Sequence, residues 1–493
     1  MIFISLIILT LTTLYIYYFI LNNNRRHVIK KINILNGPNS IPFIGSSHYF
    51  FRHNFEEFLD IFIKWSENYS SPFKFWIANK LIICIYEPDQ MQVILQNSID
   101  KSIMYKSFEP VIKKGLITDP VSIWSKNRKA MAPCFNTLTL EEFFNTFVEH
   151  SLILTDEFKQ IAINGKEIDL SHYILKYTAN IICGTMSNVK PELVSNQINQ
   201  CIKISERIRK IITLRLRSMF LFPDFIFNLT AAGREQKKHI NILNSLINKL
   251  IEHHLINAQN SNIKNKTTRK TLLDILIKMF DNENVSQEKI RNNLCTIVLA
   301  GLDTTAITLN FAIFMLALHP HIQNKVYKEI KEICGSNPIK YEDLHYMQYL
   351  DCVIKETMRV FPPIPLIGRS LTKDVKIGDT IFPKGADVFL LIITLHRNEK
   401  FWQNALTFDP DRFLPDKIEI SQKHYMPFSY GVRNCIGKKF AMLSIKIVLA
   451  TLIRNFIFET DSNIKINEIR LNMDIILCSV KPLCVKLETR VPN

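Results

Sequence analysis

Apolar and polar positions follow different periods in different parts of the chain. From about residue 53 to 330, apolar side chains recur at a helical spacing. Residues 80–90 (KLIICIYEPDQ) are instead typical of a strand that ends in a polar turn. Beyond residue 360 the pattern changes to short strands and turns, then a helix from Gly437 and a closing pair of strands near residues 474–488. The patterning predicts a mainly α fold with a small β region.

A single apolar segment precedes this body. Residues 2–24 carry no charge, and an apolar helix of about 20 residues spans the hydrocarbon core of a bilayer. The basic run RRHVIKK follows directly, and basic flanks stay on the cytoplasmic side. A buried N-terminal helix is the alternative; a cleaved signal peptide would carry its positive charge before the apolar run. The expected segments are a transmembrane signal anchor, a basic flank with a Pro/Gly linker, and one large folded domain: residues 1–21, 22–45 and 46–493.

Three further segments depart from a simple amphipathic pattern. Residues 219–227 (MFLFPDFIF) are apolar but contain Pro223, and they belong either to the core or to a surface that dips into the bilayer. Residues 294–318 are apolar enough to cross a membrane, but they contain Asp303, and a lone charge in lipid is costly. They therefore predict a long helix through the core. The polar residues 257–270 predict a loop between helices.

Composition narrows the choice of fold and partner. The 493 residues, 47% of them hydrophobic, can fill one large core or two fused ones, and the low count of 13 glycines favours helices. The formal net charge of +16 fits a solvated basic surface, an anionic membrane or an acidic protein partner. No basic block is interleaved with aromatic residues, so nucleic acid is not expected as a partner.

The ten cysteines are scattered without CxxC pairs, so neither a zinc nor an iron–sulfur site is indicated. One of them has unusual neighbours in the run FSYGVRNCIG, which frames Cys435 with two glycines and an arginine. A thiolate that ligates a metal must be deprotonated and shielded. Gly431 permits a tight turn, and a helix beginning near Gly437 places its positive end beside the sulfur. Arg433 can pair with a carboxylate of a flat cofactor, so we interpret the run as a site for haem iron with an axial thiolate.

This run resembles the haem-binding motif of cytochrome P450 enzymes at every fixed position, namely Phe428, Gly431, Arg433, Cys435 and Gly437. Other motifs follow in the order usual for that family, so the resemblance covers nearly the whole chain. The runs ETMRVFPPIPLIGR and RNCIGKKFAM are most similar to family 4 and its animal, insect-like relatives. Many of these are microsomal hydroxylases of fatty acids or hydrocarbons. The resemblance implies the P450 fold and a haem-thiolate catalytic domain.

The resemblance also assigns a structural network. KETMR supplies Glu356 and Arg359, which lie three residues apart and therefore on one face of a helix. FDPDRF supplies Arg412. In P450s the matching residues form a buried network that stabilises the core on the haem side.

Three arginines are candidates for the two haem propionates. WSKNR supplies Trp124 and Arg128, which match the W-x-x-x-R pair that the family uses for a propionate. Arg369 falls where related enzymes place another propionate-binding arginine, and Arg433 is the third. Non-covalently held haem b is the expected cofactor, because Ala300 stands where many family 4 members have a glutamate that can bond to a haem methyl.

Asp303 and Thr304, in AGLDTT, are the catalytic candidates. One interpretation is a satisfied polar pair that bends the helix near Gly301. The other, implied by the resemblance, is a proton relay to dioxygen, with Thr305 as support. We predict the relay.

The implied reaction is monooxygenation of a hydrophobic substrate of fatty-acid, hydrocarbon, terpenoid or xenobiotic type. Electrons are expected from NADPH through NADPH–cytochrome P450 reductase, with cytochrome b5 as a second donor, at the endoplasmic reticulum membrane with the catalytic domain in the cytosol. Lys438 and Lys439 lie on the cysteine side, where family members dock the reductase. The alternatives are a haem-thiolate isomerase or dehydratase that needs no electron donor, and a non-enzymatic haem-binding sensor. Apolar candidates for the substrate pocket are Leu299, Ile364, Leu366 and Ile367.

Overall fold

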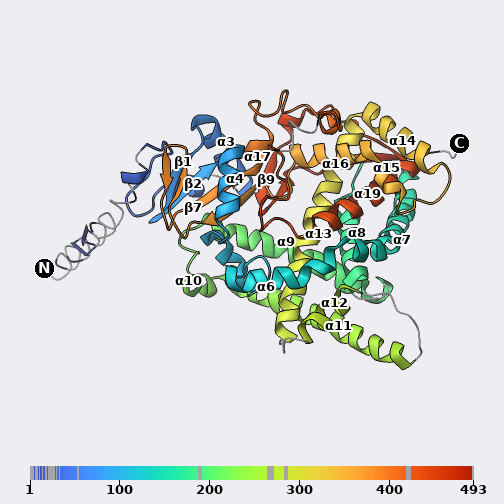
Figure 1. The fold of residues 1–493 in the computed structure, drawn as a ribbon, viewed down its shortest axis with the longest axis horizontal. Coiled ribbons are helices and arrows are strands. Elements are labelled where there is room, and N and C mark those ends of the chain that lie inside the picture. Colours follow the sequence, from blue (N-terminus) through green and yellow to red (C-terminus); the bar gives the residue numbers. More distant parts are fainter. Residues whose placement is uncertain are drawn as a thin grey trace.

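The computed structural model describes residues 34–52, 55–186, 191–263, 271–281, 287–417 and 423–490, together with isolated positions before residue 34. The predicted anchor at residues 1–21 lies largely outside the described residues. The described part is mainly helical with a small β content, and strands β1, β2 and β7 lie at one end of the molecule (Figure 1). This is the predicted fold class.

The helices account for most of the described chain. Their bounds are α2 His48–Arg52, α3 Phe58–Asn68, α4 Pro88–Asn97, α5 Glu109–Ile112, α6 Val121–Met131, α7 Thr137–Ala162, α8 Ser171–Met186, α9 Pro191–Arg217, α10 Asp224–Leu229, α11 Ala231–Ile263, α12 Leu272–Asp281, α13 Gln287–Leu318, α14 Pro320–Cys334, α15 Asp343–Tyr346, α16 Gln348–Val360, α17 Ile392–His396 and α19 Lys438–Asn455.

The strands form four small sheets. Their bounds are β1 Phe73–Ile77, β2 Lys80–Ile85, β3 Ile168–Asp169, β4 Leu366–Ser370, β5 Val375–Ile377, β6 Thr380–Phe382, β7 Asp387–Leu391, β8 Phe456–Glu459, β9 Leu471–Asp474, β10 Ile476–Ser479 and β11 Cys484–Thr489. The largest sheet has the order β1-β2-β7-β4, in which β2 and β7 are parallel and the other pairs antiparallel. The smaller sheets are β5-β6, β9-β10 and β3-β11-β8.

Three details of the predicted elements need correction. The polar turn after β2 begins helix α4, because Pro88 occupies the first helical turn, where its missing N–H costs nothing. The loop predicted at residues 257–270 is wrong up to Ile263, since α11 continues to that residue, and extending a formed helix is easier than starting one. The two closing strands do not pair with each other: β10 pairs with β9, and β11 pairs with β8 and β3.

Helix α13 runs through the centre of the molecule, where it packs against α8, α11, α16 and α19 (Figure 1). In the part of the chain that the structure describes, it is the one helix long and apolar enough to cross a membrane. Most of its apolar stretch is buried inside the protein, however, from Leu294 to Ala317. The prediction of a core helix is therefore confirmed.

Helix α16 is held in place by a buried ion network. Both terminal oxygens of Glu356 accept hydrogen bonds from Arg359, at 2.7 and 2.8 Å, and neither side chain is exposed. Arg412, in the short 3-10 helix η4 (Pro410–Phe413), places its Nε 3.5 Å from Glu356 Oε1. The guanidinium of Arg359 also lies over the Trp402 ring. The three residues of the predicted network are therefore in contact, and they connect α16 to η4.

Candidate functional site

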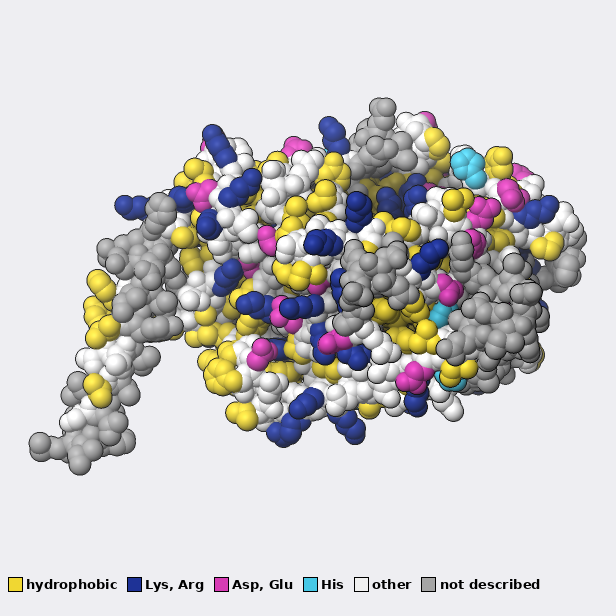
Figure 2. All heavy atoms as spheres, turned by 60° about the horizontal axis from the view of Figure 1, so that its bottom comes forward, with side chains coloured by type: hydrophobic (Ala, Val, Ile, Leu, Met, Phe, Trp, Pro, Cys, Tyr) yellow, Lys and Arg dark blue, Asp and Glu magenta, His cyan; other side chains and the backbone are white. Residues whose placement is uncertain are grey.

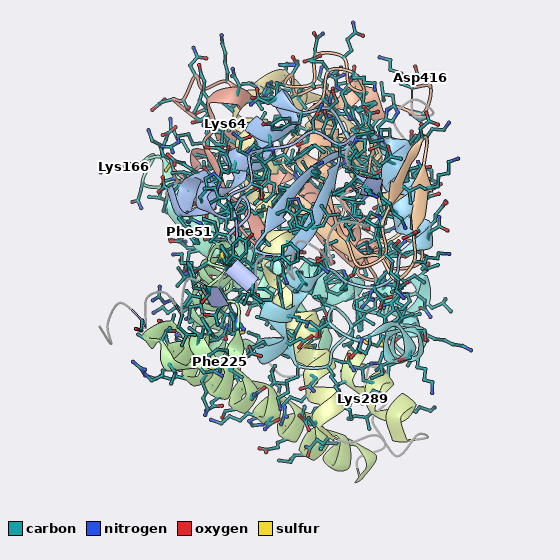
Figure 3. All side chains as sticks on the ribbon, turned by 90° about the vertical axis from the view of Figure 1, so that its left-hand side faces the viewer. Phe51, Lys64, Lys166, Phe225, Lys289 and Asp416 are labelled. Atoms are coloured by element: carbon teal, nitrogen blue, oxygen red, sulfur yellow. The ribbon has the colours of Figure 1, made fainter. Side chains whose placement is uncertain are left out.

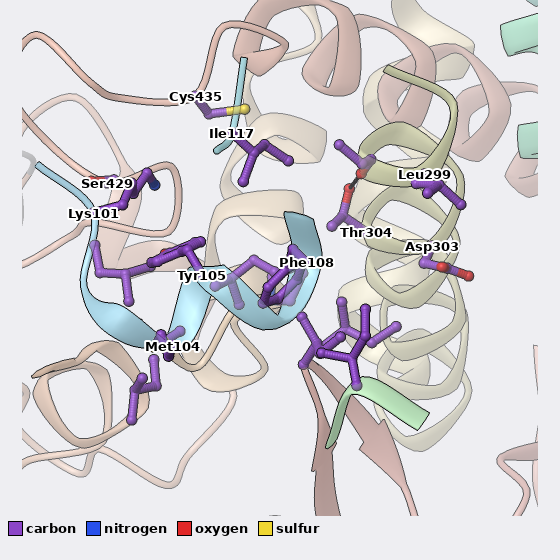
Figure 4. Close-up of a pocket in the computed structure, with 18 of the residues that line it drawn as sticks. Lys101, Met104, Tyr105, Phe108, Ile117, Leu299, Asp303, Thr304, Ser429 and Cys435 are labelled. Carbon is purple, nitrogen blue, oxygen red and sulfur yellow. Dashed lines mark hydrogen bonds between the residues drawn. The ribbon is translucent and has the colours of Figure 1, made fainter. Parts of the chain in front are cut away.

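A cavity of about 710 Å³ lies between α13, α9, the cysteine run and the sheet strands (Figure 4). Its lining is dominated by apolar side chains. The four predicted pocket residues are among them: Leu299 on α13, Ile364, and Leu366 and Ile367 on β4. An apolar space of this size favours a hydrophobic small molecule.

The loop before α19 presents the Cys435 side chain to this cavity (Figure 4). Gly431 has φ +74°, and a Cβ on it would lie 2.6 Å from the Leu95 carbonyl oxygen, so the turn requires glycine. The Cys435 N–H then donates to the Phe428 carbonyl at 2.9 Å, and Gly437 precedes the first residue of α19. A Cβ on Gly437 would lie 3.9 Å from the Cys435 sulfur, an ordinary van der Waals contact, so Gly437 lies directly beside the sulfur.

Burial and nearby cations act in opposite directions on the Cys435 thiol. Burial raises the pKa of the Cys435 thiol, while the Gly437 N–H and the charges of Arg128, Lys438 and Lys101 oppose that rise. The side chain is exposed to the cavity, although it lies deep inside the protein. A metal ion at the sulfur would remove the proton outright, as happens with coordinating thiols. The donor set therefore fits a metal-bound thiolate.

Four cations line the cavity near Cys435: Lys101, Arg128, Arg369 and Arg433. Arg369 is 1% exposed, and its Nε, like that of Arg433, has no hydrogen-bond partner among the described residues. Burial, and then the neighbouring Arg369, lowers the pKa of Arg433 to about 10. Burial, Arg369 and Arg433 likewise hold the pKa of Lys101 well below its usual value. Buried cations with unused donors call for anionic partners, and two carboxylates would supply them.

The backbone positions three of these residues. Arg433 donates to the carbonyls of Ile99 and Asp119 at 2.8 and 2.7 Å, and its guanidinium lies 4.9 Å from the centre of the Trp124 ring. Lys101 forms a β-bridge with Arg369, so the two residues lie side by side, and both line the cavity. Sequence reasoning missed Lys101, because an isolated lysine in a loop carries no pattern.

On α13, Thr304 and Asp303 both line the cavity, but their side chains point in different directions (Figure 4). The Thr304 hydroxyl donates to the Ala300 carbonyl at 2.7 Å. Asp303 is 5% exposed and accepts hydrogen bonds from Ser205 at 2.7 Å and from Arg209 at 2.6 Å. The predicted acid and alcohol are therefore neighbours on one helix whose side chains hydrogen-bond to different partners. Sequence reasoning missed Ser205 and Arg209, because their contact with Asp303 depends on how α9 packs.

Gly301 allows this part of α13 to lie close to α8. A Cβ on Gly301 would be 3.0 Å from Cδ1 of Ile182, so a larger residue would require the Ile182 side chain to shift. Thr305, the predicted supporting residue of the relay, is buried, with only 3% of its surface exposed.

Comparison with known proteins decides the family. A family model described as Cytochrome P450 matches residues 35–487. The chain belongs to the cytochrome P450 family. Relatives of this P450 include Cytochrome P450 4V2 of Mus musculus, 33% identical over 91% of this chain and 88% of the relative. Cytochrome P450 4d1 of Drosophila melanogaster is 30% identical over 94% and 95%, and Cytochrome P450 4c21 of Blattella germanica is 28% identical over 99% of each chain.

These relatives confirm the predicted resemblance to family 4, including its insect members. Cytochromes P450 are monooxygenase oxidoreductases with a haem-iron cofactor, and this P450 is an enzyme of that class. The residues around the cavity fit the cofactor. The Cys435 sulfur faces the cavity, where it would bind the iron, and the cation cluster has the charge for two propionates, with the unpaired Nε atoms of Arg369 and Arg433 as donors.

The cavity collects predicted residues that are far apart in the sequence. All seven cofactor candidates line it: Trp124, Arg128, Arg369, Phe428, Arg433, Cys435 and Gly437. Both catalytic candidates, Asp303 and Thr304, line it as well. The predicted network residues Glu356, Arg359 and Arg412 lie outside the lining and contact one another instead.

Proposed function

We propose that this P450 hydroxylates a hydrophobic substrate with dioxygen and electrons from NADPH. In the balanced reaction, RH, dioxygen, two electrons and two protons give ROH and water. The observation that supports this proposal is that Cys435 and Thr304 face the same apolar cavity from different elements (Figure 4). Haem held by Cys435 would supply the chemistry that activates dioxygen.

The protein's own residues would control substrate, water and protons. Apolar side chains such as Leu299 and Ile367 would hold the substrate and exclude bulk water. The Thr304 hydroxyl would hold a proton at the wall of the cavity, so that bulk water need not enter the cavity to supply it. Arg128, Arg369 and Arg433, with Lys101, would neutralise the propionates and fix the cofactor's edge. Ala300 offers no carboxylate, so the haem is proposed to be held without a covalent bond.

The alternatives make a different prediction about the electron donor. An isomerase or dehydratase would act on its substrate without NADPH, and a sensor would bind haem without turnover. The retention of Asp303 and Thr304 beside the cavity favours oxygen activation, because both alternatives have no use for proton delivery. NADPH–cytochrome P450 reductase, with cytochrome b5 as a second donor, is the proposed partner. Lys438 and Lys439 lie next to the cysteine run, and Figure 2 shows basic side chains spread over one face rather than gathered in one block.

We also propose attachment to the endoplasmic reticulum membrane with the catalytic domain, residues 46–493, in the cytosol. Apart from the apolar residues 1–21, an outer aromatic patch formed by Phe51, Phe220 and Phe225 supports this. Phe51 and Phe220 stack with 5.8 Å between ring centroids, and Phe225 is 72% exposed. Phe51 and Phe225 lie on the same side of the molecule (Figure 3). Within residues 219–227 only Phe227 is fully buried, so this segment is partly core and partly surface.

The test combines a spectral screen for binding with a comparison of the product formed and the NADPH consumed. The purified protein is titrated with fatty acids, alkanes, terpenoids and steroids while the haem spin-state band is followed. The compound with the largest shift is then incubated with reductase and NADPH. Formation of a hydroxylated product in proportion to NADPH supports the proposal. Conversion of the compound without NADPH would identify an isomerase or dehydratase instead, and haem binding without any turnover would favour the sensor.

A further inference from the structure

The charges on the cavity wall limit the charge that a substrate can carry. Among the described residues, the lining contains one carboxylate, that of Asp303, and six cations: Lys80, Lys101, Arg128, Arg209, Arg369 and Arg433. Four of these cations lie near Cys435 and are the candidates for the haem propionates. Lys80 and Arg209 are the other two, and the part of the cavity that they line is called the substrate side below.

Arg209, on α9, is paired with a carboxylate at the wall. Its Nη1 lies 2.6 Å from Oδ2 of Asp303, and the two side chains are 16% and 6% exposed. Ser205, one turn earlier on α9, donates to the same oxygen at 2.7 Å. Asp303 and Lys101 lie on opposite sides of the cavity, so this ion pair is separate from the cations near the cysteine (Figure 4). The charge of Arg209 is therefore balanced before any ligand enters.

Lys80, the first residue of β2, is paired in the same way. Its Nζ lies 3.1 Å from Oδ1 of Asp387 and donates to the Gly385 carbonyl at 2.9 Å. Asp387, the first residue of β7, has no exposed surface, and its Oδ2 accepts from the Ile103 N–H at 2.7 Å. Since the backbone holds one oxygen of this buried carboxylate, the other stays at Lys80. Both cations of the substrate side thus have a carboxylate partner inside the protein.

The four cations near the cysteine have other partners. Arg128 and Arg433 donate to oxygens of the protein, and on the proposed function all four face the two propionates. Burial, Arg369 and Arg433 hold the pKa of Lys101 well below its usual value, which reduces the surplus of positive charge at this edge. A substrate carboxylate would have to compete with the propionates there.

We propose that this P450 takes uncharged hydrophobic substrates, such as esters, alcohols and hydrocarbons, and rejects the corresponding free carboxylic acids. This inference rests on the proposed monooxygenase function. An ionised carboxylate is costly to remove from water unless a cation accompanies it, and both cations of the substrate side are already paired. The carboxylate of Asp303 also repels a second one. An uncharged molecule breaks no ion pair, so the wall selects by penalising the charged form.

The test compares straight-chain carboxylic acids with their methyl esters, which differ in charge near neutral pH while the chain stays the same. Each compound is titrated into the haem-loaded protein without an electron donor, and the haem spin-state band gives a dissociation constant. We expect each acid to bind at least about tenfold more weakly than its ester. Equal or tighter binding of the acids, or failure of every ester to bind, overturns the proposal.

Matched variants show whether the ion pair causes the rejection. Asp303→Asn leaves Arg209 without its carboxylate, so the affinity for acids should rise about tenfold while that for esters changes little. Arg209→Met/Asp303→Asn removes the freed cation and should return the affinity for acids to that of the parent protein. Glu206→Gln removes a carboxylate of α9 that pairs with Lys210 outside the lining, and it should change neither affinity. A gain for acids that persists in the double variant contradicts the role of Arg209.

Asp387→Asn repeats the test at the other cation and carries it alone if Asp303→Asn does not hold haem. The amide oxygen can still accept from the Ile103 N–H, while Lys80 loses its charged partner, so acids should again bind more tightly. Lys80→Met/Asp387→Asn is the control and should not show the gain. Absence of a gain at both positions overturns the proposal. Esters that bind but yield no NADPH-dependent product would contradict the proposed function instead, because the binding comparison needs no turnover.

Discussion

Arg128 donates from both terminal nitrogens to Asn434, the residue before Cys435: one bond goes to the backbone oxygen and one to the side-chain oxygen, each 2.8 Å long. Helix α6 is thereby fastened to the loop that presents the sulfur. The arrangement uses the planar fork of arginine, which a lysine cannot reproduce.

Arg128→Lys should therefore weaken the hold on the loop even though the charge is kept. Hydrogen bonds from a charged group are worth about 1.5–3 kcal/mol each, so loss of one bond should lower haem retention about tenfold or more. The ratio of haem to protein absorbance after gel filtration measures this. Lys129→Gln, at an exposed position of the same helix, is the control and should retain haem like the parent protein.

Cys435→Ser should abolish the strongly red-shifted absorption of the reduced carbon monoxide complex, because that band requires a thiolate ligand. The remaining nine cysteines, none of them in a disulfide, lie outside the glycine-framed loop and should not substitute for it. A variant that kept the band would show that another residue is the ligand.

Thr304→Ala should leave haem content unchanged but divert electrons to peroxide. Removing a group that takes part in proton transfer slows that step about a hundredfold or more, so product per NADPH should fall sharply. Thr304→Ser retains a hydroxyl in the same position and should restore the coupling. Equal coupling in the alanine and parent proteins would rule out the hydroxyl as a proton carrier.

Haem should separate from the polypeptide when the protein is denatured in acid and run on a reversed-phase column. Ala300 is exposed to the cavity and carries only a methyl group, while the carboxylate of Asp303 is turned to α9. Haem that co-elutes with the chain would mean that another side chain forms a bond to it. In Ala300→Glu, part of the haem should become protein-bound after turnover.

Removal of residues 1–21 should weaken vesicle binding but leave residual binding through the outer aromatic patch. Burying a phenylalanine side chain is worth about 1.5–3 kcal/mol, so adding Phe220→Ser or Phe225→Ser should each lower the partition coefficient about tenfold. Flotation with liposomes measures it. Leu138→Ser changes a side chain that is 74% exposed on α7, outside the patch, and should have no effect.

Much of the site could be predicted because its chemistry is local. The turn at Gly431, the sulfur of Cys435 and the start of α19 follow one another in ten residues, and their geometry depends mainly on the backbone between them. Glu356 and Arg359 are three residues apart on one helix, so their pairing needed no tertiary information.

The parts that escaped prediction depend on packing between distant elements. Arg209 is one of several charged residues along α9, and only the position of α9 over α13 distinguishes it from Lys210, whose partner is Glu206 on the same helix. Lys101 becomes a cofactor candidate only through its bridge to Arg369, which is far from it in the sequence. Neither relationship leaves a periodic trace in the sequence.

The segment from the end of α9 into the first turn of α10 has two faces with different neighbours. Met219, Phe222 and Pro223 line the cavity, while Phe220 and Phe225, interspersed with them, face outward. On the proposed placement at a membrane, a hydrophobic molecule would pass from lipid to the cavity along apolar side chains without entering water. The concentration that governs turnover would then be moles of substrate per mole of lipid. Two compounds with equal affinity for the cavity would differ in apparent KM by the ratio of their lipid–water partition coefficients, and diluting a fixed amount of substrate into more vesicles would slow the enzyme.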